Sequence, residues 1–211
     1  AARPGVRALL LYPMNALAND QLKRLRQLLR NHPELTFGRY TGETRADRKS
    51  AEHEFKMLHP GEKLLSNELL SREEMQARPP HLLLTNYAML EYLLLRPEDS
   101  ELFGDPSDST WRFIVVDEAH MYDGASGAEI GYLLRKLRSR VEQGGAIQCV
   151  ATSATMGDDL HSAAEFATNL FGVPFDADRG DIIRAVTKAM PDIRPWGRFP
   201  REALCPEQTL D

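Results

Sequence analysis

The sequence predicts an α/β protein that is built on a mainly parallel sheet. Short apolar runs alternate with helical patterns along most of the chain, which is typical of βαβ units. The apolar runs are nearly continuous rather than alternating, as in strands that are buried on both faces. We expect these strands over 6–12, 35–40, 81–85, 113–116 and 147–151.

The segments between these strands carry apolar residues at helical spacing. The first, 16–30, places leucines on one side and basic side chains on the other. Further helices are expected over 45–58, 87–95, 130–141 and 158–171. Thr44 is expected to cap the helix at 45–58, and Gly172 to end the last helix. The stretch 124–127 contains two glycines and is expected to be a flexible link.

The chain is expected to hold one main unit, 1–175, followed by a segment of weaker pattern. Residues 59–80, broken by proline and glycine, are expected to form an insertion at the sheet edge, with Ser71 capping a short helix. Residues 176–211 are interpreted as a linker, a lid or the start of a next domain, with a possible helix at 182–190. Because the chain enters its first strand almost at once, we expect a fragment whose fold is incomplete at its N-terminus.

Bulk composition narrows the classes of protein. A chain of 211 residues suits one sizeable domain. Its net charge of −5 gives no global basic field, although a local basic stripe would suffice for nucleic acid. Two cysteines, Cys149 and Cys205, are too few for a disulfide framework or a four-thiolate metal site, which favours a reducing, cytoplasmic setting. No apolar run approaches the roughly 18 residues that span a bilayer, so no membrane partner is expected.

Two adjacent carboxylates follow the strand at 113–116. Asp117 and Glu118 begin the tetrapeptide Asp-Glu-Ala-His, at the sheet edge where open α/β sheets bind ligands. Like charges placed side by side need a nearby cation. A magnesium-bound nucleotide is the usual cation in phosphoryl-transfer enzymes, where an Asp holds the ion, and the second carboxylate can orient a water. An acidic surface turn is the alternative interpretation.

A hydroxyl-rich stretch, Thr152-Ser153-Ala154-Thr155, follows the next strand about one βαβ unit later. We therefore expect it beside His120, where its hydroxyls could hydrogen-bond the imidazole. An ordinary strand-to-helix turn is the alternative.

In this order, the motifs resemble those of the first RecA-like motor domain of superfamily-two DEAH/DExH-box helicases. The tetrapeptide at 117–120 resembles the Walker B motif of that family, and 153–155 its coupling motif. Three other stretches resemble its motifs that contact the nucleic-acid backbone: Pro13-Met14-Asn15-Ala16-Leu17, Thr41-Gly42-Glu43 and Thr85-Asn86-Tyr87.

The resemblance implies a RecA-like three-layer α-β-α fold and a set of residue roles. Asp117 would hold magnesium through water, Glu118 would orient the attacking water, and His120 would link the nucleotide state to Ser153 and Thr155. The implied nucleic-acid contacts are Pro13, Asn15, Ala16, Gly42, Thr44, Thr85 and Asn86.

The same resemblance implies the cofactors and partners. ATP and magnesium would serve the whole protein, which would act on nucleic acid, with DNA favoured over RNA, and would carry a second RecA-like domain. The stretch Tyr122-Asp123-Gly124-Ala125-Ser126-Gly127 and the basic helix after it resemble bacterial DNA-repair and phage-defence (DISARM-like) DEAH helicases. The basic faces of the helices at 23–30 and 135–140 could add electrostatic attraction for the nucleic acid. The alternative interpretation is that these are ordinary solvated helix faces.

One family motif does not occur in the chain, namely the phosphate-cradling Gly-x-x-x-x-Gly-Lys-Ser/Thr loop. We therefore expect ATP hydrolysis to belong to the whole protein and the isolated chain to be inactive. The leading hypothesis is a fragment of an ATP-dependent helicase or translocase. The alternative is a degenerate RecA-like module that binds nucleic acid or a protein and hydrolyses nothing.

Overall fold

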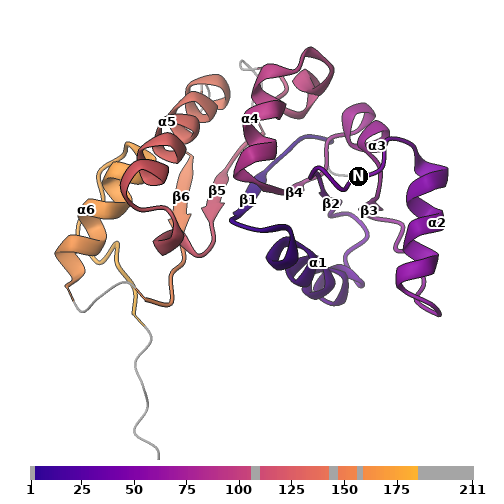
Figure 1. The fold of residues 1–211 in the computed structure, drawn as a ribbon, viewed down its shortest axis with the longest axis horizontal. Helices are drawn as coiled ribbons and strands as arrows, with labels where there is room; N and C mark the ends of the chain where they lie inside the picture. The colour runs from indigo at the N-terminus through magenta and orange to yellow at the C-terminus, as the bar shows by residue number, and fades with distance from the viewer. Residues whose placement is uncertain (1–2, 106–109, 143–146, 156–158, 185–211) are drawn as a thin grey trace, which may run out of the picture.

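The computed structural model describes residues 3–105, 110–142, 147–155 and 159–184. Its centre is a six-stranded sheet with the order β3-β2-β4-β1-β5-β6 (Figure 1). Every strand pair is parallel, so the predicted α/β class is confirmed. The strands are β1 (Ala8–Tyr12), β2 (Phe37–Arg39), β3 (Glu68–Leu69), β4 (Leu82–Asn86), β5 (Phe113–Val116) and β6 (Gln148–Ala151).

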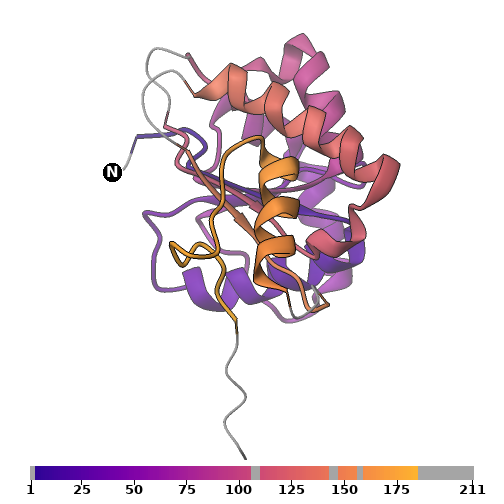
Figure 2. The ribbon, with the colours of Figure 1, turned by 90° about the vertical axis from the view of Figure 1, so that its left-hand side faces the viewer.

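Helices cover both faces of this sheet, which makes three layers. In Figures 1 and 2, α1 lies on one side of the sheet, and α4 and α5 lie on the other. None of the helices that the structure describes is long and apolar enough to cross a membrane. The α-helices are α1 (Asn15–Leu29), α2 (Arg48–Leu58), α3 (Arg72–Ala77), α4 (Tyr87–Leu95), α5 (Gly124–Val141) and α6 (Leu160–Phe171), with 3₁₀ turns η1 (Pro97–Leu102) and η3 (Ala119–Met121).

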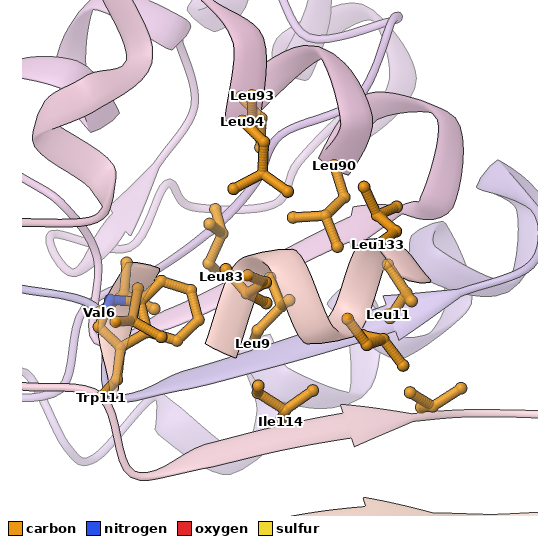
Figure 3. Packing of buried hydrophobic residues seen from close by; sticks show 14 of the residues in the cluster. Val6, Leu9, Leu11, Leu83, Leu90, Leu93, Leu94, Trp111, Ile114 and Leu133 are labelled. Carbon is orange, nitrogen blue, oxygen red and sulfur yellow. The ribbon is translucent and has the colours of Figure 1, made fainter. Parts of the chain in front are cut away.

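The core is divided by the sheet because successive side chains of a strand point to opposite faces. Leu9 and Leu11 of β1 belong to a large apolar cluster that also contains Leu90 of α4 and Leu133 of α5 (Figure 3). Tyr12 joins a smaller cluster formed with α1. Because helices bury both faces of the sheet, the strands have nearly continuous apolar sequences.

The start of α2 differs from the prediction. Asp47, not Thr44, caps this helix, and its carboxylate accepts a hydrogen bond from the Ser50 amide at 2.9 Å. Thr44 instead accepts from the Thr41 amide at 2.9 Å and donates to the Arg39 carbonyl at 2.8 Å. The hydroxyl that was expected to cap the helix therefore closes the turn that follows β2.

The expectation of a flexible link at 124–127 was wrong, because α5 begins at Gly124 and continues to Val141. Gly127 is needed in this helix: a Cβ there would lie 2.5 Å from the Tyr122 carbonyl oxygen. The glycine thus permits close packing of the helix start rather than flexibility. The 3₁₀ helix η1 follows α4.

β3, which lies within 59–80, is an edge strand of the sheet and pairs with β2. Ser71 caps α3 in a capping box with Glu74, which confirms the predicted cap. Asn67 is buried and donates to the carbonyls of Leu29, His32 and Leu35 at 2.9–3.1 Å. The boundaries 1–175 and 59–80 stay predictions. Most of the expected helix at 182–190 lies outside the described residues.

Candidate functional site

Asp117 follows β5 at the carboxyl edge of the sheet, and it is hydrogen-bonded to residues on both sides, in β1 and in the loop after β6. Its amide donates to the Leu11 carbonyl of β1 at 2.9 Å. Its carboxylate accepts a hydrogen bond from the Thr152 hydroxyl, which follows β6. One side-chain oxygen and the backbone are thereby anchored, and the carboxylate keeps lone pairs for a further ligand.

Glu118 adopts a left-handed backbone conformation, with φ 50° and ψ 45°. Among the described residues it is the only one other than glycine with a positive φ. The next residue, Ala119, donates its amide to the Thr152 carbonyl at 2.8 Å. Non-glycine residues in this region cost on the order of 1–2 kcal/mol, and such strain is concentrated at functional sites.

His120 lies against the loop after β6, as predicted. Its Nδ1 is 3.1 Å from Ser153 Oγ and 3.3 Å from Glu118 Oε2. β5 and β6 are neighbours, with Val116 opposite Ala151, so the expected topology is confirmed. The Thr155 amide donates to Ser153 Oγ at 3.3 Å, and no contact between the Thr155 side chain and the imidazole is seen within the described residues.

Two buried tyrosines lie near the Asp117 carboxylate. Burial, and then the charge of Asp117, raise the pKa of Tyr12 to about 12. The same two causes raise the pKa of Tyr122 well above its usual value. Each is only 4% exposed, so both remain neutral hydroxyls beside this carboxylate.

The donor set at this edge can be compared with what a magnesium ion needs. Across the part of the chain that the structure describes, no group of three His, Cys, Asp or Glu side chains is arranged to hold a metal. Magnesium commonly keeps several waters and uses one or two carboxylates together with substrate phosphates. The single anchored carboxylate of Asp117 fits that mode.

A second group of polar side chains lies at the ends of β1, β2 and β4. Asn86 Nδ2 donates to Asn15 Oδ1 at 2.7 Å, and Asn15 Nδ2 donates to Glu43 Oε1 at 3.0 Å. Arg39 donates to the other Glu43 oxygen at 2.9 Å. The hydrogen bond from Asn15 is the largest cause that lowers the pKa of Glu43; burial opposes it, and the charge of Arg39 lowers the pKa further.

Glu43 was missed as a site residue by the sequence reasoning, although it belonged to a quoted motif. It joins the turn after β2 to Asn15 at the start of α1. The only local signal was its place directly after Thr41-Gly42, and that signal does not reveal which partners it contacts.

Thr44 and Thr85, which sequence reasoning placed among the strand-contacting residues, point inward. Both are buried, and Thr85 donates its hydroxyl to the Tyr40 carbonyl at 2.7 Å. Gly42 and Ala16 are exposed, while Pro13 is partly buried. Gly42 and Ala16 therefore contribute to the outer surface of this edge, whereas Thr44 and Thr85 do not.

The basic helix faces are partly engaged within the fold. Arg26 of α1 forms a buried ion pair with Glu68 at 2.8 Å. Arg135 and Arg138 of α5 donate to carbonyls at the end of α6, at 3.1 Å each to Asn169 and Phe171. A cavity of about 400 Å³ lies between α1 and α2, and its lining includes Glu43 but neither Asp117 nor Glu118.

The sequence of this chain matches a known protein family and a known relative. A family model for DEAD/DEAH box helicases matches residues 1–163. The chain is 30% identical to the Druantia protein DruE of Escherichia coli (strain UMEA 4076-1), in an alignment covering 91% of this chain and 15% of DruE.

Solved structures of the DUF1998 helicase MrfA have a similar fold. MrfA bound to DNA matches with a TM-score of 0.57 and 24% identity, covering 80% of this chain and 20% of MrfA. MrfA bound to DNA and AMPPNP, also 24% identical, matches with a TM-score of 0.58. The chain spans only about a fifth or less of the length of these relatives. Because the family model covers well over half of the residues, the chain belongs to the DEAD/DEAH box helicase family, with the fold of a RecA-like helicase domain.

Proposed function

We propose that this chain is the part of an ATP-dependent nucleic-acid helicase that holds the hydrolytic carboxylates and contacts one nucleic-acid strand. The supporting observation is that both groups of side chains share one edge of the sheet. Asp117 follows β5 and Asn15 follows β1, whereas Asn86 is the last residue of β4. β1 lies between β4 and β5, so the two groups are neighbours in space.

The hydrolytic roles follow from the geometry at the end of β5. Asp117, anchored by Thr152, would hold magnesium through water. A bound magnesium–nucleotide would supply the charge neutralisation that phosphoryl transfer needs. Glu118 would accept a hydrogen bond from the attacking water and orient it. His120, bonded to Ser153, would transmit the state of this site to the neighbouring strand.

The strand-contacting role belongs to the ends of β1, β2 and β4. Pro13, Ala16 and Gly42 offer small or backbone surfaces, and Asn15 and Asn86 offer amide groups. Thr44 and Thr85 would support this surface from within. Such contacts would position a strand without reading its sequence. DNA is favoured as the partner because MrfA, which has a similar fold, is bound to DNA in two structures.

The whole protein would act in the cytoplasm and add what this chain does not contain. The sequence has no Gly-x-x-x-x-Gly-Lys-Ser/Thr loop, so the phosphate cradle and a second RecA-like domain would be supplied elsewhere in the protein. We extend the proposal to the bacterial DNA-repair and phage-defence DEAH helicases, on the residues from Tyr122 to Gly127.

The test is ATP hydrolysis by the full-length protein with single-stranded oligonucleotides present. Glu118→Gln should lower the rate by roughly 10²–10⁴-fold while nucleotide binding persists, since a positioned general base contributes about that much. Glu129→Gln, an exposed carboxylate on α5, is the matched control and should keep the wild-type rate.

A Glu118→Gln variant with half the wild-type rate would contradict the assigned role. A wild-type protein that binds nucleic acid but hydrolyses no ATP would support the non-hydrolysing module instead.

A further inference from the structure

A carboxylate, that of Glu43, lies among the polar side chains at the ends of β1, β2 and β4. Its Oε1 accepts from Asn15 Nδ2 at 3.0 Å, and its Oε2 accepts from Arg39 at 2.9 Å. The Glu43 side chain is 52% exposed, so it is not an internal packing group. A carboxylate repels the phosphates of a nucleic-acid strand. A strand-contacting surface would therefore bind more tightly without this charge, unless the side chain serves another purpose.

The hydrogen bonds that begin at Glu43 reach two further segments of the chain. Asn15, which donates to Glu43, accepts from Asn86 Nδ2 at 2.7 Å. The Asn86 oxygen accepts from the Met89 amide at 2.8 Å, and this bond caps α4. The turn after β2, the start of α1 and the end of β4 are therefore joined through two amide side chains, those of Asn15 and Asn86.

The order of donors and acceptors fixes the orientation of both amides. Because the Asn86 oxygen accepts from a backbone N–H, its nitrogen faces the Asn15 oxygen. The Asn15 nitrogen is then left to donate to Glu43. A carboxylate, which only accepts, is suited to end such a series. Each amide nitrogen keeps a second hydrogen that is bonded to no group in the described ranges.

We infer that Glu43 is a positioning residue, which holds the amide groups of Asn15 and Asn86 so that the second N–H of each can donate to the nucleic-acid strand. The inference rests on the proposed function, in which these two asparagines contact that strand. It follows that the Glu43 side chain aids binding although its charge opposes binding. If Glu43 were only a surface charge, removing it would tighten binding.

The experiment compares two substitutions that both remove the charge. Glu43→Gln keeps an oxygen that can accept from Asn15, whereas Glu43→Ala removes it. Binding of a labelled oligothymidylate to the full-length protein would be followed by fluorescence anisotropy at several salt concentrations. Ordering one freed side chain on binding costs roughly two- to tenfold in affinity. Glu43→Ala should bind more weakly than Glu43→Gln by that factor, and Glu43→Gln should bind at least as tightly as the wild type.

The ratio between these two variants should be the same at every salt concentration, because they carry the same charge. Glu54 is the matched control, since it pairs with Arg45 at 2.9 Å and bonds to neither asparagine in the described structure. Glu54→Ala and Glu54→Gln should bind equally. In an Asn15→Ala background, which removes the partner of the carboxylate, the two Glu43 substitutions should also bind equally.

Equal affinities of Glu43→Ala and Glu43→Gln would overturn the inference while leaving the proposed function standing. A difference between them that persists in the Asn15→Ala background would also overturn it, because the effect would then not pass through Asn15. A wild-type protein that fails to bind the oligonucleotide would overturn the proposed function, and the inference with it.

Discussion

His120 Nδ1 lies 3.1 Å from Ser153 Oγ, although 33 residues separate them in the chain. The contact joins the loop after β5 to the loop after β6, which are paired strands. Ser153 Oγ also accepts from the Thr155 amide at 3.3 Å. A displacement of His120 would therefore reach the backbone of the second loop through one hydroxyl, that of Ser153.

The first prediction concerns this hydroxyl. In the full-length protein, Ser153→Ala should keep most of the ATPase rate but lower strand separation per ATP at least about tenfold, equivalent to about 1.4 kcal/mol of lost coupling. The reason is that alanine removes the link to His120 without touching Asp117 or Glu118. ATP hydrolysis and unwinding of a labelled duplex would be measured in parallel.

The matched control for that experiment is Ser139→Ala, whose hydroxyl is exposed on α5 and bonds only to its own helix in the described structure. It should leave both rates unchanged. An equal fall of hydrolysis and unwinding in Ser153→Ala would show that Ser153 serves hydrolysis rather than coupling.

The second prediction concerns the strained backbone of Glu118. Glycine adopts its φ of 50° without a steric cost, so Glu118→Gly should stabilise the 211-residue chain by about 1 kcal/mol. That gain corresponds to a rise of roughly 2–4 °C in Tm for a domain of this size. Glu118→Gln keeps the strain and should show no rise when both are followed by circular dichroism. A lower Tm for Glu118→Gly would refute the strain argument.

The third prediction concerns the reactivity of Cys149. Burial raises the pKa of its thiol to about 11, with Glu142 adding to the rise and Arg138 opposing it. At pH 8 the native thiol should be alkylated by iodoacetamide roughly a hundredfold more slowly than in the denatured chain, because only the thiolate reacts. Between pH 8 and 10 its rate should climb about tenfold per unit. Peptide mass spectrometry follows Cys149 separately from Cys205, and equal native and denatured rates would contradict the prediction.

The sequence by itself determined the class of fold and the place of Asp117 and Glu118 after β5, at the carboxyl edge of the sheet. Continuous apolar runs predict parallel strands because those strands are covered on both faces, and this signal is local. The spacing between Asp117 and Ser153 then predicts neighbouring strand ends, since one βαβ unit returns the chain to the same edge. These inferences need only the pattern of apolar residues and the number of residues between the motifs.

Only the tertiary structure decided which polar groups face outward and which partners they have. Thr44 and Thr85 lie in motifs that resemble surface contacts, yet both residues are buried and their hydroxyls donate to the backbone carbonyls of Arg39 and Tyr40. Arg72 reaches the turn at 41–43 from about 30 residues away, and hydrogen bonding of this kind depends on how distant segments pack. The physical reason is that a buried polar atom must find its partner in space, and a sequence pattern records the type of side chain but not its direction.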